Sequence, residues 1–143
     1  MGVGAVVGAG LVAVAAPASA ATQCLVIFRI SYNTPGPDLR TNTSLNGEWI
    51  QLHNRCTTTI TLTSSRIRDA AGHTYTFGTS TLGGGRYVKV HTGRGTNTAT
   101  DRYWAQAWYI WNNDRDTASL YNHFGALIGR CSYNNPHVLS LYC

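Results

Sequence analysis

Short stretches in which apolar and polar residues alternate recur along most of the chain. Seven stand out: 24–32, 48–56, 60–67, 73–77, 86–91, 117–121 and 126–131. Clusters of Gly, Asn, Asp, Thr and Pro separate them, and no window shows helical periodicity. Alternation with a period of two is typical of half-buried strands. The pattern therefore predicts an all-β fold, a sandwich of about seven to nine short antiparallel strands.

The alternation also assigns side chains to faces. In the first stretch four residues are expected to share one face: Val26, Phe28, Ile30 and Tyr32. In the second, Ile50 and Leu52 point one way, and Trp49, Gln51 and His53 point the other way. Two long polar segments, 33–46 and 93–101, are predicted to be loops without secondary structure.

Residues 1–20 are uncharged and end in Pro-Ala-Ser-Ala, a small-x-small pattern that signal peptidase accepts. Their apolar run is shorter than the ~20 residues that a membrane span needs. We predict a signal peptide at 1–20 and an exported domain at 21–143. The basic segment that should open a signal peptide is missing after Met1, so we expect the true start upstream. An uncleaved anchor and a buried strand are the alternatives.

The exported region contains four cysteines: Cys24, Cys56, Cys131 and Cys143. An even number in an exported chain implies disulfides, with three possible pairings. If the first two strands form a hairpin that pairs Tyr32 with Glu48, Cys24 falls opposite Cys56, close to disulfide reach. This register predicts a bond between these two cysteines and a second bond that ties the C-terminus to the last strand.

The charge of the chain favours anionic partners. Eleven basic and six acidic side chains give a net charge of +5 and a pI near 9.3. Expected partners are an anionic polymer, a glycan or another protein of the cell envelope, and nucleic acid is a further possibility. Nearly all of the cations are Arg, however, and a GC-rich genome produces such a bias without any selection for binding.

Four motifs follow one another in a fixed order: EWIQLHN (48–54), RDAAG (68–72), GRGTNT (93–98) and WNNDRDTASL (111–120). Together they resemble the lamin tail domain, in its bacterial secreted form, over about residues 21–133. The resemblance implies an immunoglobulin-like β-sandwich that serves binding or scaffolding. The chain departs from the family at Ser64 and Ser65, where Gly-Trp or Gly-Tyr is common. This departure implies that another ring fills the core there, or that packing is looser.

The motif residues are expected to serve the fold: Glu48, Trp49, Asn54, Asp69, Trp111, Asn112, Asn113 and Asp116. Trp111 can bury its ring while its N–H finds a carbonyl. Asn112 and Asn113 suit a turn, and Asp116 is expected to accept the backbone N–H groups that hold it. Glu48, the only glutamate, is expected to cap loop amides at one end of the sandwich rather than to act as a catalytic acid.

Catalytic, metal and cofactor sites are not indicated. The five histidines (53, 73, 91, 123 and 137) lack ligand spacing, and there is no Gly-x-Ser-x-Gly elbow. GRGTNT is interpreted as a hairpin loop, because it lacks the strand-to-helix context of a phosphate loop. Oxygen-bearing side chains in the long loops suit calcium, but not at EF-hand spacing: Asp38, Asn42, Asn46, Asp101, Asn112, Asp114 and Asp116.

An aromatic cluster interleaved with arginine supplies the binding candidates: Arg102, Tyr103, Trp104, Trp108, Tyr109 and Arg115. Aromatic faces can stack on sugar rings or bases, and Arg can contact phosphate or carboxylate. Burial of some of these rings in the core is the alternative, and the sequence leaves both open. We expect a secreted, non-enzymatic module for binding, adhesion or scaffolding at the cell envelope. The alternative is a nucleic-acid-binding module that uses a basic, aromatic surface, and an uncharacterised hydrolase is a third candidate.

Overall fold

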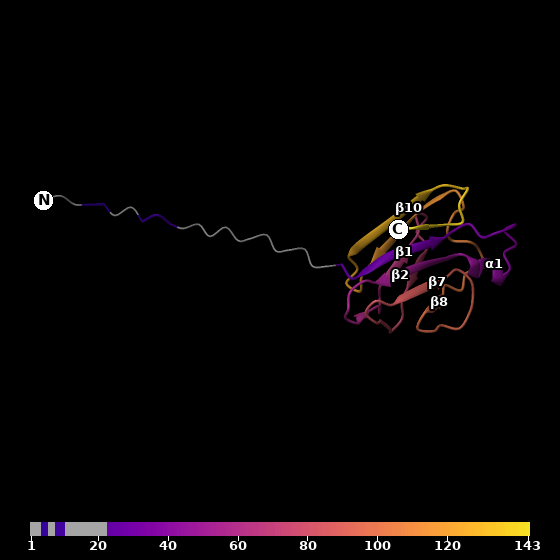
Figure 1. The fold of residues 1–143 in the computed structure, drawn as a ribbon, viewed down its shortest axis with the longest axis horizontal. Helices are drawn as coiled ribbons and strands as arrows, with labels where there is room; N and C mark the ends of the chain where they lie inside the picture. The colour runs from indigo at the N-terminus through magenta and orange to yellow at the C-terminus, as the bar shows by residue number, and fades with distance from the viewer. Residues whose placement is uncertain (1–3, 6–7, 11–22) are drawn as a thin grey trace.

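Two β-sheets form the body of the computed structural model, which describes residues 4–5, 8–10 and 23–143 (Figure 1). In spatial order, the five-stranded sheet contains β11 (Ser140–Tyr142), β1 (Leu25–Ser31), β2 (Trp49–Asn54), β7 (Tyr87–His91) and β8 (Asp101–Tyr103). The four-stranded sheet contains β10 (Leu127–Asn134), β9 (Arg115–Tyr121), β4 (Arg66–Arg68) and β5 (Thr74–Thr76). A two-residue ladder joins β3 (Ile60–Thr61) to β6 (Thr81–Leu82).

This architecture confirms the predicted all-β, immunoglobulin-like sandwich, and it differs from the prediction in two respects. The described residues form 11 strands rather than seven to nine, because 60–67 and its neighbours divide into two- and three-residue pieces. One pair is parallel: β7 pairs with β8, with Lys89 beside Asp101. The long polar loop 92–100 carries the chain back along β7 before β8 begins. The two strands therefore run in the same direction and do not form a hairpin.

The first strand carries a β-bulge that reverses its alternation. Its pairing with β2 runs from Ser31 opposite Trp49 to Leu25 opposite Asn54, with a shift between Ile27 and Arg29. The extra residue moves the following side chains to the other face. Four residues of this stretch are therefore buried: Leu25, Ile27, Ile30 and Tyr32. The expectation that all four residues of the alternation share one face was wrong, because Val26 and Phe28 are not buried with Ile30 and Tyr32.

A short helix, α1 (Asn42–Gly47), interrupts the segment that was predicted to be a loop without secondary structure. Thr41 is its N-cap, and the Thr41 side chain accepts a hydrogen bond from the Ser44 amide at 3.2 Å. Leu45 is its one buried residue. A helix of this length buries a single side chain, so its sequence shows no periodicity.

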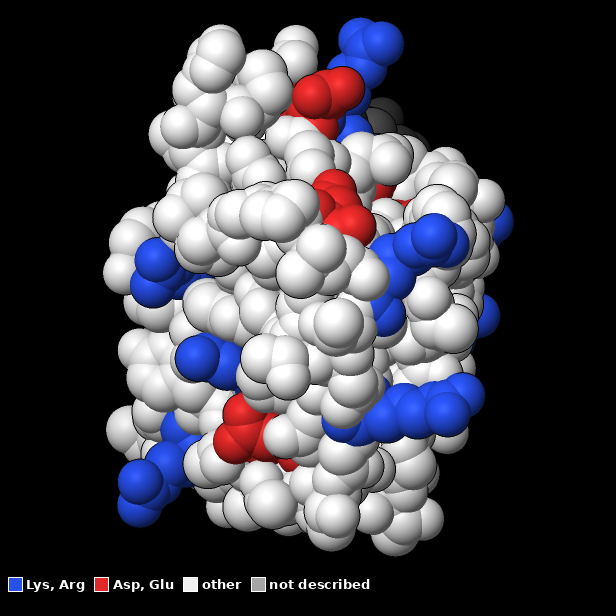
Figure 2. Space-filling view, turned by 90° about the vertical axis from the view of Figure 1, so that its right-hand side faces the viewer, with Lys and Arg blue, Asp and Glu red and all other residues white. Residues whose placement is uncertain are grey.

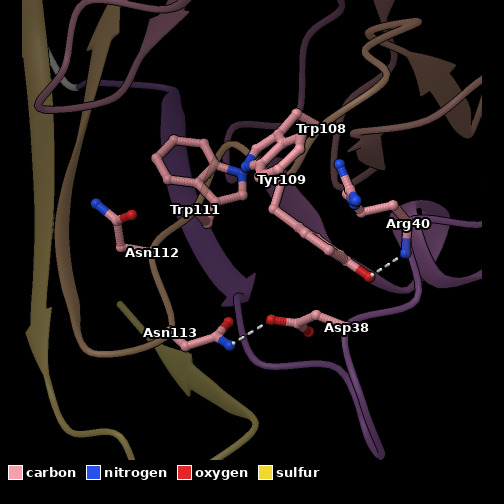
Figure 3. A pocket seen from close by; sticks show the side chains of 7 residues that line it. All are labelled: Asp38, Arg40, Trp108, Tyr109, Trp111, Asn112 and Asn113. Carbon is pink, nitrogen blue, oxygen red and sulfur yellow. Dashed lines mark hydrogen bonds between the residues drawn. The ribbon is translucent and has the colours of Figure 1, made fainter.

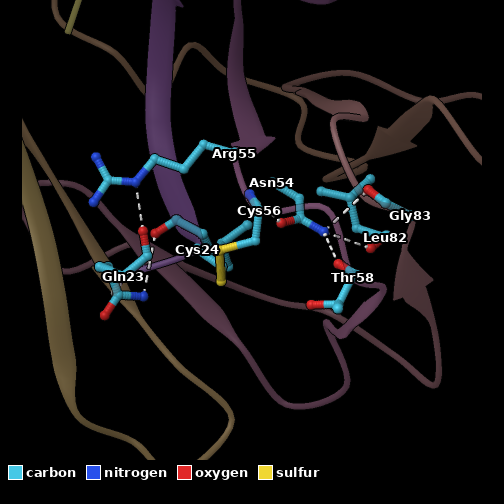
Figure 4. Close-up of a disulfide and its surroundings, with 9 residues drawn as sticks. Gln23, Cys24, Asn54, Arg55, Cys56, Thr58, Leu82 and Gly83 are labelled. Carbon is cyan, nitrogen blue, oxygen red and sulfur yellow. Dashed lines mark hydrogen bonds between the residues drawn. A yellow bond between two sulfur atoms is a disulfide. The ribbon is translucent and has the colours of Figure 1, made fainter. Parts of the chain in front are cut away.

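Both disulfides connect the predicted partners. Cys24 is bonded to Cys56 with 5.1 Å between their Cα atoms, and Cys131 is bonded to Cys143 with 5.8 Å between them. The predicted register holds near Ser31 but is displaced by one residue beyond the bulge, where the Arg55 amide donates to the Cys24 carbonyl. The half-cystines lie one residue off direct opposition and still meet (Figure 4).

Ser64 and Ser65, where the chain departs from the family, lie at a turn beside an open pocket. Ser64 has φ of 65°, a conformation that favours glycine, which explains why glycine suits this position. Ser65 is buried beside an apolar pocket of about 490 Å³, which Leu25, Ile60 and Ile128 also line. Both expectations for this region, a replacing ring and looser packing, stay predictions.

The predicted signal peptide at 1–20 lies largely outside the described residues. Within the part that is described, no helix has the length and apolar character needed to span a membrane.

Candidate functional site

Glu48 organises the end of the sandwich at which β2 begins. It is fully buried, and its Oε1 accepts hydrogen bonds from the Thr92 hydroxyl at 2.6 Å and from the amides of Ile110 and Trp111 at 2.7 and 3.0 Å. Burial raises the pKa of this carboxyl to about 7, although the three hydrogen bonds lower it. Its Oε2 has no partner among the described residues. Glu48 thereby fixes the backbone that presents Trp111.

Asp116 fixes the next part of the same loop. Its carboxylate accepts hydrogen bonds from the amides of Ala70, Asn112 and Thr117 at 2.9, 3.2 and 2.8 Å. Asp69, the other buried aspartate, accepts from the His73 amide at 2.7 Å and bonds the His73 ring at 2.6 Å. Both buried carboxylates therefore hold turns of the fold in place by accepting backbone amide hydrogen bonds.

An open pocket of about 310 Å³ lies at the loop held by Glu48 (Figure 3). We call it the loop-end pocket, and its lining residues are Asp38, Arg40, Trp108, Tyr109, Trp111, Asn112 and Asn113. The Trp108 ring is 61% exposed, and the Arg40 guanidinium carbon lies 4.2 Å from its centroid. The pocket thus combines an exposed aromatic surface with several hydrogen-bonding groups.

Hydrogen bonds between segments distant in sequence hold the pocket together. The Asn113 side-chain amide donates to the Asp38 carboxylate at 3.0 Å, and the Arg40 amide donates to the Tyr109 hydroxyl at 3.3 Å. The Tyr109 hydroxyl also bonds the Ser44 hydroxyl on α1. Because the 38–44 segment and the 109–113 segment are tied to each other, the walls of the pocket are formed before any ligand arrives.

The GRGTNT loop closes against α1. The side chains of Asn42 and Asn46 each donate to the Arg94 carbonyl at 2.9 Å, and the Arg94 amide donates to Asn42 at 2.7 Å. The Asn97 side chain accepts from the Tyr103 amide at 3.0 Å. The hydrogen bonds to Arg94 hold the GRGTNT loop against α1.

The structure divides the predicted binding cluster. Trp108 and Tyr109 meet in the loop-end pocket, whereas Trp104 is buried in the core. Arg102 and Tyr103 lie on β8, where the Tyr103 ring stacks on His91 at 5.0 Å. Arg115 is exposed and lines a neighbouring pocket. Contiguity in sequence did not bring these side chains to one surface.

Asp38 and Arg40 were not predicted to line this pocket, although Asp38 was among the candidate calcium ligands. Both lie in the polar 33–46 segment, and only the fold brings that segment to Trp108. Their signal in the sequence was weak: two charges beside the turn residues Pro35 and Gly36.

A second surface that the sequence did not indicate is the outer face of the five-stranded sheet. There the Trp49 ring lies 5.6 Å from the Arg29 guanidinium carbon and 4.2 Å from the Lys89 ammonium. Phe28, displaced by the bulge, contacts three further rings edge-on: His53, Tyr87 and Tyr142. We call this surface the aromatic sheet face. The alternation of 48–56 already placed Trp49 and His53 on this side.

The carboxylates Asp101 and Asp38 each have a hydrogen-bond partner. His91 bonds Asp101 at 2.7 Å, and this hydrogen bond is the main reason why the pKa of Asp101 lies below its ordinary value. Asp38, by contrast, faces Asn113. Within the described residues, no group of three or more His, Cys, Asp or Glu side chains is placed to hold a metal ion.

Comparison with known proteins agrees with the motif order. The family model of the Lamin Tail Domain matches residues 18–135, which include both sheets apart from β11. No curated protein matches the chain. Lamin tail domains are immunoglobulin-like modules, and the two packed sheets of this chain have that architecture. The chain therefore belongs to the lamin tail domain family.

Proposed function

We propose that this chain is an exported, non-enzymatic module that binds a component of the cell envelope through the loop-end pocket. The exposed Trp108 carries the proposal: a large ring open to solvent, in a pocket whose backbone the buried Glu48 holds in place. Ligand sites are typically concave and aromatic with a few fixed polar groups. The two disulfides and the signal-like sequence of residues 1–20 support export.

Cosedimentation with purified envelope fractions of the producing organism tests this function. The Trp108→Ala variant should bind at least tenfold more weakly than the wild type. Phe124→Ala is the matched control, because Phe124 is also an exposed ring, 83% accessible. It lines the apolar pocket beside Cys24 and Ser65 instead of the loop-end pocket. Equal binding by wild type and Trp108→Ala would contradict the proposed site. No binding by the wild type would contradict the function.

A nucleic-acid-binding module is the second candidate, and the aromatic sheet face favours it. Its rings and the cations Arg29 and Lys89 are the groups that bind single strands by stacking and phosphate contact. At the loop end, by contrast, Lys and Arg are scattered and acidic residues lie among them (Figure 2).

Gel shifts with single-stranded oligonucleotides at low and physiological salt separate this candidate from the first. Binding that falls steeply with salt and is lost in an Arg29→Ala/Lys89→Ala variant would support it. The absence of any shift at low salt would remove it.

A further inference from the structure

The floor of the loop-end pocket contains a hydrogen-bond donor without an acceptor. The Trp111 side chain is 1% exposed, and its indole N–H has no hydrogen-bond partner among the described residues. The indole nitrogen lies on the side of the ring that faces Trp108 (Figure 3). A buried donor left unpaired is unfavourable, so few are retained in native proteins. Because the nitrogen itself has almost no accessible surface, an oxygen of a bound ligand becomes its acceptor once the side chains around it shift on binding.

The groups around this donor carry no net charge. Arg40 and Asp38 contribute one cation and one anion, and the Asn113 side chain already bonds the carboxylate at 3.0 Å. The remaining polar side chains of the lining are neutral amides and one phenol. A polyanion would gain one cation and meet one carboxylate, so charge does not favour it here. An uncharged ligand rich in hydroxyl groups matches both the donors and the acceptors.

The shape of the pocket selects among uncharged ligands. Its volume of about 310 Å³ lies at the lower end of the range of small-molecule sites, about 300–1,000 Å³. The Arg40 guanidinium lies over one face of the Trp108 ring, and the exposed remainder of the ring offers a flat apolar wall. The C–H face of a pyranose is the apolar face of a molecule whose edge bears hydroxyls. A sugar ring can therefore contact Trp108 with its face while its edge reaches the polar groups.

We infer that the loop-end pocket binds a neutral pyranose unit of an envelope glycan, with one sugar oxygen accepting the Trp111 indole N–H. Trp108 packs against the C–H face of the sugar, and Asp38 and Asn112 receive its hydroxyl groups at the rim. This inference rests on the proposed function, since it names the ligand class of the same site.

The test is an NMR titration of the oxidised, exported protein, with the indole N–H signals of its four tryptophans as the readout. The probes are the methyl glycosides of glucose, galactose, mannose and N-acetylglucosamine, together with cellobiose and chitobiose. Glucuronate and glycerol phosphate are the anionic comparisons. At least one neutral sugar should shift the Trp111 signal saturably and more than the Trp49 signal, and the anionic probes should bind more weakly.

Two variants define the site. Trp108→Ala, at an exposed position, should keep the fold and raise the Kd for the sugar at least tenfold, whereas Phe124→Ala should leave it unchanged. A sugar that binds both variants equally would overturn the inference, and so would tighter binding of the anionic probes.

The outcome for the ligand class is distinguishable from the outcome for the function. If envelope binding depends on Trp108 but no neutral sugar shifts the Trp111 signal, the ligand class is wrong and the proposed function stands. If the wild type does not bind envelope fractions at all, the proposed function fails.

Discussion

The two ends of β2 are capped by buried polar side chains on the same face of the strand, and the two caps differ in chemistry. At one end the Asn54 amide donates to the carbonyls of Thr58, Leu82 and Gly83 at 2.8–3.0 Å and accepts from the Cys56 amide at 3.1 Å (Figure 4). At the other end the Glu48 carboxyl only accepts, and one of its oxygens has no partner.

The difference shows how each end is specialised. Asn54 offers donors and an acceptor, so it can join loops that present both carbonyls and an amide, and the neighbouring disulfide adds a covalent tie. Glu48 accepts from two backbone amides and the Thr92 hydroxyl, and its stabilising effect depends on protonation. The pocket with unpaired hydrogen-bonding capacity lies at the Glu48 end.

The largest effect is expected from making the Asn54 end resemble the Glu48 end. An Asn54→Asp substitution removes the donor and directs a carboxylate at three carbonyl oxygens. We expect it to lower the free energy of unfolding at pH 7 by about 4 kcal/mol, because an uncompensated charge is buried. Urea unfolding should also show partial recovery at pH 4. A loss below about 1 kcal/mol would show that the two caps are interchangeable.

Removal of the Cys24–Cys56 bond should have an effect of similar size. The bond closes a separation of 32 residues, and loop entropy gives it about 4 kcal/mol, against about 3 kcal/mol for the bond that spans 12 residues. Unfolding of Cys24→Ala/Cys56→Ala and Cys131→Ala/Cys143→Ala measures both. The losses should not vary between pH 5 and 8. A larger loss from Cys131→Ala/Cys143→Ala would contradict the larger contribution that is predicted for the Cys24–Cys56 bond.

Glu48 should make stability depend on pH at its own end. Its pKa of about 7 in the folded protein exceeds the ordinary value of 4.5, so the folded state binds more protons between these values. Its contribution is therefore complete below pH 4.5 and is lost as the pH rises through 7.

Comparison of the wild type with Glu48→Gln isolates this titration. The difference in their free energies of unfolding should shift against the wild type by about 3 kcal/mol between pH 4 and 8. A difference that does not change with pH would contradict the raised pKa.

The smallest effect on stability is expected from Trp108→Ala. The ring is exposed, so the free energy of unfolding should change by no more than about 0.5 kcal/mol. Thermal unfolding measures it. A loss of several kcal/mol would mean that Trp108 stabilises the fold. Weaker binding by this variant would then reflect unfolding rather than a lost ligand contact.

Alternation along the chain was sufficient to predict the sandwich, the strand that carries Ile50 and Leu52, and the cysteine pairing. It was not sufficient for the face of Phe28, because a single bulged residue reverses the pattern and leaves no mark in composition. The helix α1 was missed for a related reason: one buried residue, Leu45, gives no period to detect.

The candidate site could be predicted only in part. Trp108 and Tyr109 were named from an excess of aromatic residues. Their neighbours Asp38 and Arg40 lie about seventy positions earlier in the sequence, and long-range loop contacts place them there. Trp111 was expected to pair its N–H with a carbonyl, and the structure instead leaves that donor unpaired.

Backbone amide chemical-shift mapping with solubilised envelope glycan fragments tests most directly whether binding belongs to the Glu48 end of the sandwich. The account predicts that perturbed amides cluster at 38–40 and 108–113, around the loop-end pocket. Perturbations centred on 122–128 and Gln23, around the apolar pocket at the disulfide end, would contradict it.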